Sequence, residues 1–372
     1  MRKQNNSPFD NNILVLTNFI AGLYSFRKEV MKAIVDAGYE LYISVPDTDD
    51  ERVEYFKGIG CKIIRTDFNR RGMNPLADFK LMLNYRRLIK QLKPVDVLSY
   101  TIKPNVYGGI ACRLTKTPQI ANVTGLGDAM ENGGWLQKLT VTLYKIGIGK
   151  AKQVFFQNRS NKEACLRFGV ADEHAIVLPG SGVNLTHHTY QEYPDDGVIK
   201  FLYIARLQKD KGTGEYFEAA KAVKAKYPQT EFQLLGWKEG DYEGQLNELV
   251  DKGIINYLGT TSDVRPYLKD VHCTIMPSYH EGMSNVNLES AANGRPVITT
   301  DVPGCSETVD DGVSGLYCEA KSSESLIAAI ERFIVMPWEE KKLMGVNGRK
   351  KVEKEFDRNI VVKAYMDAIS II

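Results

Sequence analysis

Two glutamates, Glu281 and Glu289, frame the stretch of the chain that is best suited to bind a small molecule. An apolar run at 272–278, typical of a buried strand, comes before them, and a glycine-bearing loop and a helical pattern over 287–293 follow it. This order places the unpaired N–H groups of a helix start at the carboxyl edge of a sheet, which favours an anion. The eight-residue spacing is slightly more than two helical turns, so both carboxylates can share one face.

Carboxylates beside an anion site would repel a phosphate unless they serve another group. We therefore interpret the two glutamates as ligands for hydroxyl groups, as on a sugar and a ribose. A surface helix that carries two solvated glutamates explains the spacing equally well, because most glutamates are exposed.

Two cations, Arg206 and Lys211, flank a loop between a predicted strand at 199–204 and a predicted helix at 215–226. Arginine grips phosphate oxygens in bidentate fashion, and lysine adds a compact charge. Opposite the helix start near Glu289, the two would form a clamp for a diphosphate. The alternative is a solvated basic loop.

Composition indicates an ordinary globular protein of two domains or one large one, with 372 residues, 43% hydrophobic and 25% charged. Residues 1–185 hold 26 Lys+Arg against 17 Asp+Glu, a net charge of +9, whereas the remainder carries −7. This asymmetry predicts that the first half meets an anionic partner. Nucleic acid is not expected, because the basic residues lack interleaved aromatic side chains and the pI is only about 8.0.

The six cysteines show no paired short spacing, which predicts buried free thiols in a reducing cytosol. Residues 1–12 are polar and do not read as a signal peptide. No apolar run approaches the roughly 20 residues that a spanning helix needs. We therefore expect a cytoplasmic protein.

Alternating apolar runs and helical patterns predict two successive α/β units. We expect a first domain over 1–185, a linker over 186–197, a second domain over 198–355, and a C-terminal helix over 356–372 that packs back on the first domain.

In the first domain, the loop at 18–25 contains Gly22 but no GxGxxG fingerprint, and a helix is expected from 26 to 37. A strand at 96–100 delivers Thr101, Lys103 and Asn105 to the sheet edge where α/β proteins bind ligands.

Two basic amphipathic segments in the first domain predict contact with anionic lipid head groups. One is 65–93, with Arg70 and Arg71 in its loop, and the other is 135–152, with four lysines and no acid. A core helix with a solvated basic back is the alternative. Separately, 47–49 matches a DxD metal pattern, but 49–51 reads better as a cap for the next helix, so we expect no metal.

Several motifs together resemble the retaining glycosyltransferases of family 4, group 1, which are marked by E-x7-E. They are Glu281 with Glu289, Arg206 with Lys211, and the segments 303–307 and 311–316. The segment 100–108 resembles a subgroup that builds bacterial polysaccharides and lipid-linked oligosaccharides, including an N-acetylgalactosaminyltransferase of protein N-glycosylation. The resemblance covers nearly the full chain and implies the α/β GT-B architecture, with two Rossmann-like domains facing across a cleft.

The resemblance also implies roles for individual residues. Glu289 would bind the ribose hydroxyls, and Glu281 would bind hydroxyls of the donor sugar. Arg206 and Lys211 would hold the diphosphate, assisted by backbone groups in the helix start. Gly22 would let the first loop approach the donor. The helix-start residues in question are Gly282, Met283, Ser284 and Asn285.

The sequence departs from many relatives in one respect, because it has no histidine before His174. Lys103, Thr101 and Asn105 are candidates for the place of the first-domain histidine, and Arg70, Arg71, Thr101 and Asn105 for acceptor contacts. The family needs no metal or other cofactor.

The implied reaction moves a hexose or N-acetylhexosamine from a UDP-sugar, with retention, to a saccharide on a polyprenyl diphosphate at the inner face of the membrane. Two alternatives remain open: a UDP-sugar 2-epimerase on the same plan, and a non-catalytic partner that binds nucleotide sugars.

Overall fold

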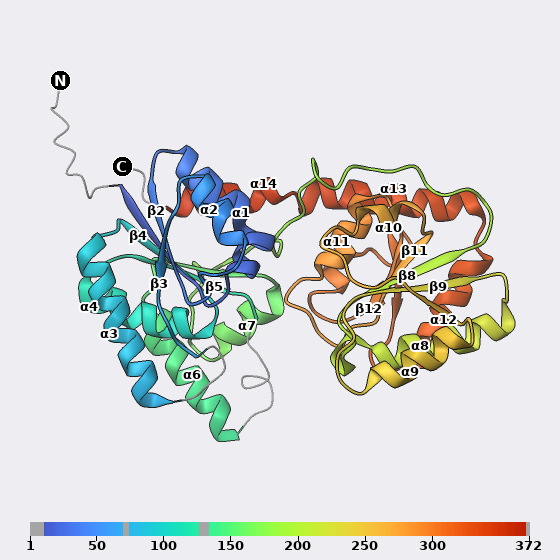
Figure 1. Cartoon of the computed structure of the whole chain (residues 1–372), viewed down its shortest axis with the longest axis horizontal. Helices are drawn as coiled ribbons and strands as arrows, with labels where there is room; N and C mark the ends of the chain where they lie inside the picture. The colour runs from blue at the N-terminus through green and yellow to red at the C-terminus, as the bar shows by residue number, and fades with distance from the viewer. Residues whose placement is uncertain (1–10, 70–73, 126–133, 370–372) are drawn as a thin grey trace. The chain divides into compact units, whose positions relative to one another are not determined.

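A computed structural model describes residues 11–69, 74–125 and 134–369 of the chain. The chain packs into two compact units: Met1–Ser181 with Asn359–Ile372, and Gly182–Arg358 (Figure 1). The segment 186–197, which we expected to be a linker, lies within the second unit.

The first unit is built on a seven-stranded parallel sheet in the order β3-β2-β1-β4-β5-β6-β7. Strand β1 is entirely buried and pairs with β2 and β4, as expected for an apolar run in a parallel sheet. The strands are β1 (Asn12–Leu16), β2 (Glu40–Val45), β3 (Lys62–Arg65), β4 (Asp96–Tyr100), β5 (Gln119–Val123), β6 (Gln153–Phe156) and β7 (Ile176–Val177).

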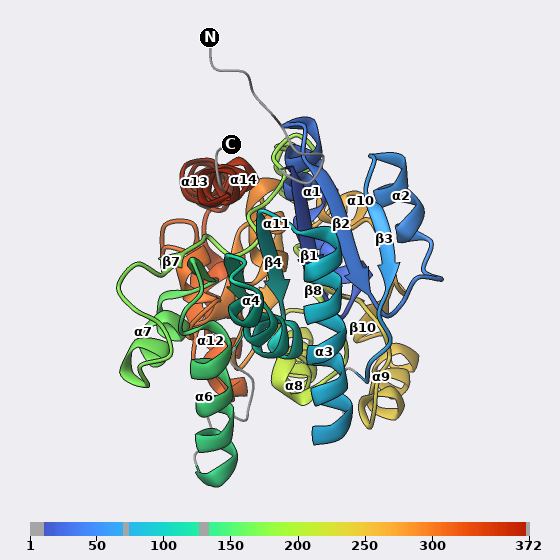
Figure 2. The ribbon, with the colours of Figure 1, turned by 90° about the vertical axis from the view of Figure 1, so that its left-hand side faces the viewer.

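Helices cover both faces of this sheet. Alternate residues of β1 point to opposite faces: Ile13 and Val15 pack with α1, α2 and α14, whereas Leu14 and Leu16 pack with α3 and α4. Figures 1 and 2 show the two helical layers. The helices are α1 (Ile20–Asp36), α2 (Arg52–Gly58), α3 (Pro75–Leu92), η1 (Pro104–Gly108), α4 (Gly109–Thr115), α6 (Gly134–Ile148), α7 (Arg159–Arg167) and α14 (Arg358–Ala368).

The second unit holds a six-stranded parallel sheet in the order β10-β9-β8-β11-β12-β13. Strands β8 and β11 are neighbours at its centre, with Leu202 opposite Thr274. The strands are β8 (Lys200–Ile204), β9 (Glu231–Leu235), β10 (Ile255–Tyr257), β11 (Cys273–Met276), β12 (Val297–Thr300) and β13 (Gly315–Cys318).

This sheet is also covered on both faces (Figure 1). Phe201 and Tyr203 join the core under α8, α9 and α12, whereas Leu202 packs with α10. Residues of α11 and α13 form a further cluster around Leu288 and Val352. The helices are η2 (Lys209–Lys211), α8 (Thr213–Lys226), α9 (Tyr242–Asp251), α10 (Arg265–Lys269), α11 (Asn285–Ala292), η3 (Ser306–Thr308), α12 (Ser323–Val335) and α13 (Trp338–Glu355).

Two features of the first unit differ from the prediction. Helix α1 begins at Ile20 rather than at 26, because both carboxylate oxygens of Asp47 lie 3.4 Å from the Ile20 N–H and cap the helix from the end of β2. The segment after β4 forms a five-residue π-helix, η1, and then α4, neither of which we predicted.

All six cysteines are free and buried, as the spacing predicted. Within the described ranges, no helix combines the length and the apolar character that crossing a membrane requires.

Candidate active site

The order of strands reverses at one place in each sheet. In the second unit, the chain proceeds outward from β8 through β9 and β10 on one side, and through β11, β12 and β13 on the other. The loops that leave β8 and β11 therefore diverge, and open α/β sheets bind ligands at the crevice this creates. The β8 loop carries Arg206 and Lys211, and the β11 loop carries Glu281.

Lys211 and Glu281 meet at this point. The Lys211 Nζ atom lies 2.7 Å from Glu281 Oε1, and Ser278 Oγ donates to the same oxygen at 2.9 Å. Each side chain of the pair is only 17% exposed, so solvent screens the attraction less than at an open surface. The structure thus joins two of the predicted site residues, which are 70 positions apart in sequence.

Arg206 does not join this pair. Its side chain is 48% exposed, and its guanidinium lies 3.8 Å from a carboxylate oxygen of Glu239. The predicted clamp therefore consists here of a fixed lysine and a solvated arginine.

Two glycines bring the loops close together. Gly212 has φ of 68°, and a Cβ atom there would lie 2.1 Å from the Pro277 carbonyl oxygen. Gly304 has φ of 82°, and its Cβ would lie 2.2 Å from the carbonyl oxygen of Glu281. No other residue type fits such contacts at positive φ.

The start of α11 presents backbone donors. Ser284 caps the helix by accepting from the Asn287 N–H at 3.3 Å, while its own N–H binds the Gly304 carbonyl at 2.7 Å. In the part of the chain that the structure describes, the N–H groups of Asn285 and Val286 have no acceptor. They remain available to an anionic ligand.

The neighbouring residues Gly282 and Met283 contribute differently from one another. The Met283 side chain packs in the cluster around Leu288. It is only 6% exposed, so only its backbone can face a ligand. Gly282 has no side chain and offers backbone alone.

Glu289 lies one turn further along α11. Desolvation raises the pKa of its carboxyl from 4.5 to about 7, against the opposing charge of Arg358, while Asp263 adds to the rise. The side chain is 28% exposed. It is a poorly solvated carboxylate that still faces water, as expected of a group that binds ligand hydroxyls.

In the first unit, the strand order reverses between β1 and β4. Thr101, directly after β4, has φ of 72°, which is uncommon for a residue other than glycine. Its Oγ1 is buried and finds no hydrogen-bond partner among the residues that the structure describes. Backbone strain of this kind clusters at functional sites, and so does the π-helix that follows.

Asp78, which the sequence did not single out, holds Lys103, and Tyr107 in turn holds Asp78. The Lys103 Nζ lies 2.6 Å from Asp78 Oδ1, and Tyr107 OH donates to Asp78 Oδ2 at 3.0 Å. Asp78 occupies a buried position of α3, in register with Leu81 and Tyr85. That helical spacing was the available signal, because an acid on an apolar face needs a partner.

Two sequence expectations for the first unit change. Asn105 is fully buried; it accepts from Ser99 Oγ at 2.8 Å and donates to the Asn122 carbonyl at 2.7 Å. It therefore cannot touch an acceptor, and that prediction is wrong.

Gly22 belongs to the first turn of α1 rather than to a loop, so the reason given for its approach to a donor does not hold. Arg70 and Arg71 lie outside the described residues.

Two aspartates in and beside the DxD pattern have structural roles. Asp47 of the pattern caps α1, and Asp50 of the cap cluster accepts from the Arg52 N–H at 2.9 Å. Among the described residues, no group of three His, Cys, Asp or Glu side chains is arranged to hold a metal ion. Independence from metal remains a prediction.

Comparison with known families matches both units. Residues 199–335 match the profile of the glycosyl transferases group 1, and residues 14–158 match that of the glycosyl transferase 4-like proteins.

Two curated relatives span most of the chain. The N,N'-diacetylbacillosaminyl-diphospho-undecaprenol alpha-1,3-N-acetylgalactosaminyltransferase of Campylobacter jejuni is 27% identical, over 93% of this chain and 95% of its own. The lipopolysaccharide core biosynthesis glycosyltransferase LpsE of Rhizobium meliloti is 30% identical, over 78% of this chain and 72% of its own.

Solved structures show the same fold. The Anabaena protein HepE in complex with UDP and glucose superposes with a TM-score of 0.77 at 17% identity, covering 96% of this chain and 98% of its own. A glycosyltransferase from Rickettsia africae superposes with a TM-score of 0.76 at 18% identity, covering 96% of this chain and 97% of its own. The chain therefore belongs to the group 1, family 4 glycosyltransferases and has their GT-B fold.

Proposed function

We propose that this glycosyltransferase moves a hexose or N-acetylhexosamine from a UDP-sugar, with retained anomeric configuration, to a saccharide carried on a polyprenyl diphosphate. Two relatives support the acceptor class, since their names specify diphospho-undecaprenol-linked saccharides. One is the Campylobacter jejuni transferase. The other is the UDP-Gal:alpha-D-GlcNAc-diphosphoundecaprenol alpha-1,3-galactosyltransferase of Escherichia coli, 25% identical over 77% of this chain and 78% of its own, whose name also specifies UDP-galactose. The similar fold of HepE, which was solved with UDP and glucose, supports the donor class.

The observation that carries the proposal is the contact between Lys211 and Glu281. An ammonium has three N–H donors, and one of them goes to Glu281. The others can donate to oxygens of the donor diphosphate, while Glu281 receives a hydroxyl of the sugar. The exposed Arg206 can swing to the phosphates, and the N–H groups of Asn285 and Val286 add fixed dipoles.

The proposed chemical step uses these residues as follows. The acceptor oxygen attacks the anomeric carbon from the side of the leaving group, and the bond to the diphosphate oxygen breaks. The acceptor proton passes to the departing diphosphate. Lys211 and the helix start stabilise the charge that develops there, which is the type of contribution that fixed donors make to catalysis. No step requires a metal.

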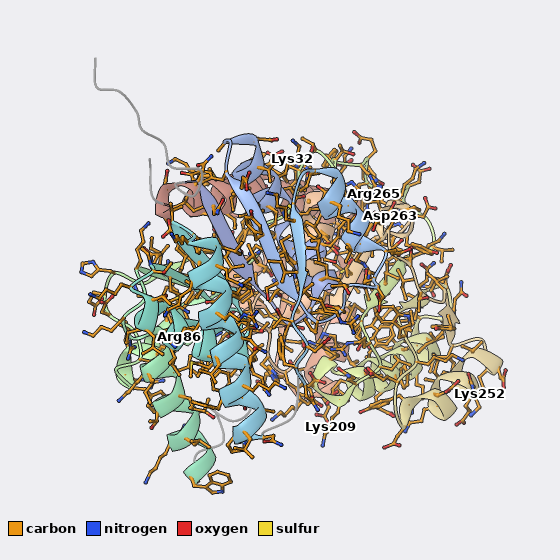
Figure 3. All side chains as sticks on the ribbon, turned by 60° about the vertical axis from the view of Figure 1, so that its left-hand side comes forward. Lys32, Arg86, Lys209, Lys252, Asp263 and Arg265 are labelled. Carbon is orange, nitrogen blue, oxygen red and sulfur yellow. The ribbon has the colours of Figure 1, made fainter. Side chains whose placement is uncertain are left out.

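The test is transfer from a panel of UDP-sugars to a polyprenyl-diphosphate saccharide, with the anomeric configuration of the product read by NMR. Lys211→Ala should lower kcat by roughly 100- to 1000-fold, the typical loss for one such donor. Lys209→Ala is the matched control, because Lys209 lies in the same short helix and is exposed (Figure 3).

Three results would contradict the proposal. They are equal activity of the two lysine variants, an inverted product, and consumption of UDP-sugar that needs no acceptor. The last would indicate an epimerase.

The outer side of α3 supports contact with an anionic membrane. Its first half exposes Leu76, Phe79 and Leu83, which are 83%, 57% and 42% exposed. These residues recur at helical spacing and continue into the exposed cations Arg87 and Lys90. An apolar stripe with flanking cations matches helices that lie in the interface of anionic membranes.

Helix α6 adds to this surface. It exposes Trp135, at 72%, and Leu139, at 42%. Both α3 and α6 lie in the helical layer that also holds α4 (Figures 1 and 2), and Figure 3 marks Arg86 on α3. An enzyme held in this way at the inner face of the cell membrane would meet its lipid-linked acceptor there.

Co-sedimentation with vesicles tests the membrane contact. A Phe79→Ser, Leu83→Ser double variant should lose most of its binding to vesicles that contain phosphatidylglycerol. Leu343→Ser provides the control, since Leu343 is 55% exposed on α13 of the second unit. Unchanged sedimentation of the double variant would refute the assignment of this surface.

A further inference from the structure

The carboxylate of Glu289 accepts no hydrogen bond from any residue that the structure describes. The nearest basic side chain is His188, whose Nε2 lies 4.0 Å from Glu289 Oε1. His188 is itself only 8% exposed. A buried imidazole therefore lies beside a carboxylate that has room for additional donors.

Asn293 fixes which nitrogen of His188 carries the proton. The Asn293 Nδ2 atom lies 3.0 Å from His188 Nδ1, and it also donates to the backbone carbonyl of Glu289 at 2.7 Å. Its Oδ1 atom accepts from Gln191 Nε2 at 3.2 Å, which supports this orientation of the amide. An amide nitrogen can only donate, so Nδ1 accepts and the proton of a neutral ring is on Nε2, which faces Glu289.

The surroundings keep this ring neutral. Burial, together with the charges of His187, Arg265 and Arg358, lowers the pKa of His188 from 6.5 to about 4, and Asp263 opposes this shift. Arg265 and Asp263 pair with each other at 2.8 Å and lie side by side in Figure 3. A neutral His188 can donate one hydrogen bond to Glu289 without neutralising the carboxylate, which has about four lone-pair sites.

We infer that His188, fixed by Asn293, is a positioning residue that orients the Glu289 carboxylate to accept hydrogen bonds from the two ribose hydroxyls of the donor nucleotide. The inference rests on the proposed function. The separation of 4.0 Å is longer than a hydrogen bond. In this inference the Glu289 carboxylate turns when the nucleotide binds, which brings its Oε1 atom within hydrogen-bond distance of His188 Nε2. The other lone pairs of the carboxylate then accept from the ribose hydroxyls.

The test compares UDP with an analogue that lacks both ribose hydroxyls, by isothermal titration calorimetry. The wild type should prefer UDP by roughly 10- to 100-fold, the range expected for hydrogen bonds to a charged group. His188→Phe keeps a ring but removes the donor. This variant should weaken the binding of UDP by roughly fivefold or more and leave the affinity for the analogue unchanged.

Further measurements separate positioning from a general structural effect. His188→Gln, which retains an N–H donor, should restore part of the preference for UDP. In turnover, His188→Phe should raise KM for the UDP-sugar at nearly constant kcat. His174→Phe is the control, because His174 is exposed and lies in the first unit.

The positioning role would be overturned if both His188 variants bound UDP and the analogue with equally reduced affinity, or if neither affinity changed. Either result would leave the proposed function standing. A wild-type chain that binds neither UDP nor a UDP-sugar would overturn the proposed function, and this inference with it.

Discussion

Replacing Glu289 by glutamine should change how the stability of the second unit depends on pH. The folded protein holds the carboxyl of Glu289 at a pKa of about 7, against an ordinary value of 4.5, with desolvation as the largest cause. The folded state therefore binds this proton more tightly than the unfolded chain does. Glutamine is nearly isosteric and has no proton to lose.

The sign and size follow from linkage. Below pH 4.5 the carboxyl is protonated in both the folded and the unfolded state, so no charged group has to be desolvated on folding. As pH rises toward 7, only the unfolded chain releases the proton, so the stability of the wild type falls. A displacement of this size corresponds to about 3 kcal/mol, and the 28% exposure of the side chain reduces it to about 2 kcal/mol. Above pH 7 the loss levels off.

Urea unfolding at pH 5 and pH 8 measures this effect. The chain has three tryptophans, and only Trp135 belongs to the first unit. In a Trp135→Phe background, fluorescence reports Trp237 and Trp338 of the second unit alone. The stability advantage of Glu289→Gln over its parent should be larger at pH 8 than at pH 5 by about 2 kcal/mol.

A matched control is Glu340→Gln, which alters an exposed glutamate at the start of α13. It should follow its parent at both pH values. Parallel pH profiles for Glu289→Gln and its parent would refute the reasoning, because they would show that the Glu289 carboxyl is not desolvated in the folded protein.

Three further perturbations test other parts of the structure. Gly304→Ala should destabilise the second unit by more than about 2 kcal/mol and impair transfer, because its Cβ meets the Glu281 backbone. Gly312 has a similar φ of 72°, but a Cβ there would meet only a flexible Arg332 side-chain atom at 3.4 Å. Gly312→Ala should therefore lower the free energy of unfolding by less, as measured by equilibrium unfolding. Asn105→Ala should destabilise the first unit by about 2–3 kcal/mol in the same measurement, since it removes the acceptor of the buried Ser99 hydroxyl and the side-chain donor to the carbonyl of Asn122. Chelation with EDTA should leave sugar transfer unchanged, and a loss that Mg²⁺ restores would contradict a metal-free mechanism.

Local sequence signals were sufficient for most of the fold. Strand β4 lies over Asp96–Tyr100 and β9 over Glu231–Leu235, where short runs rich in apolar residues had placed them. Buried parallel strands are apolar on both faces, so each can be recognised without knowledge of its neighbours. The motif around Glu281 and Glu289 indicated the family for a similar reason, because the loop and helix that carry it are contiguous in sequence.

Other features depend on residues that are far apart in the chain. The start of α1 is set by Asp47, which lies 27 positions beyond Ile20 and caps it from another strand end. Asn105 was predicted to contact a ligand, but the structure shows that it is a buried link between β4 and β5, because neighbouring strands enclose its amide.

The sequence by itself determined the two α/β units and the enzyme family, since these are encoded in short contiguous patterns. Only the tertiary structure decided that Lys211 pairs with Glu281 while Arg206 remains solvated. It also decided that Glu289 is desolvated beside His188 and that Asp78 holds Lys103. The physical reason is that desolvation and pairing depend on which segments the strand order brings together, and that order is a property of the whole sheet.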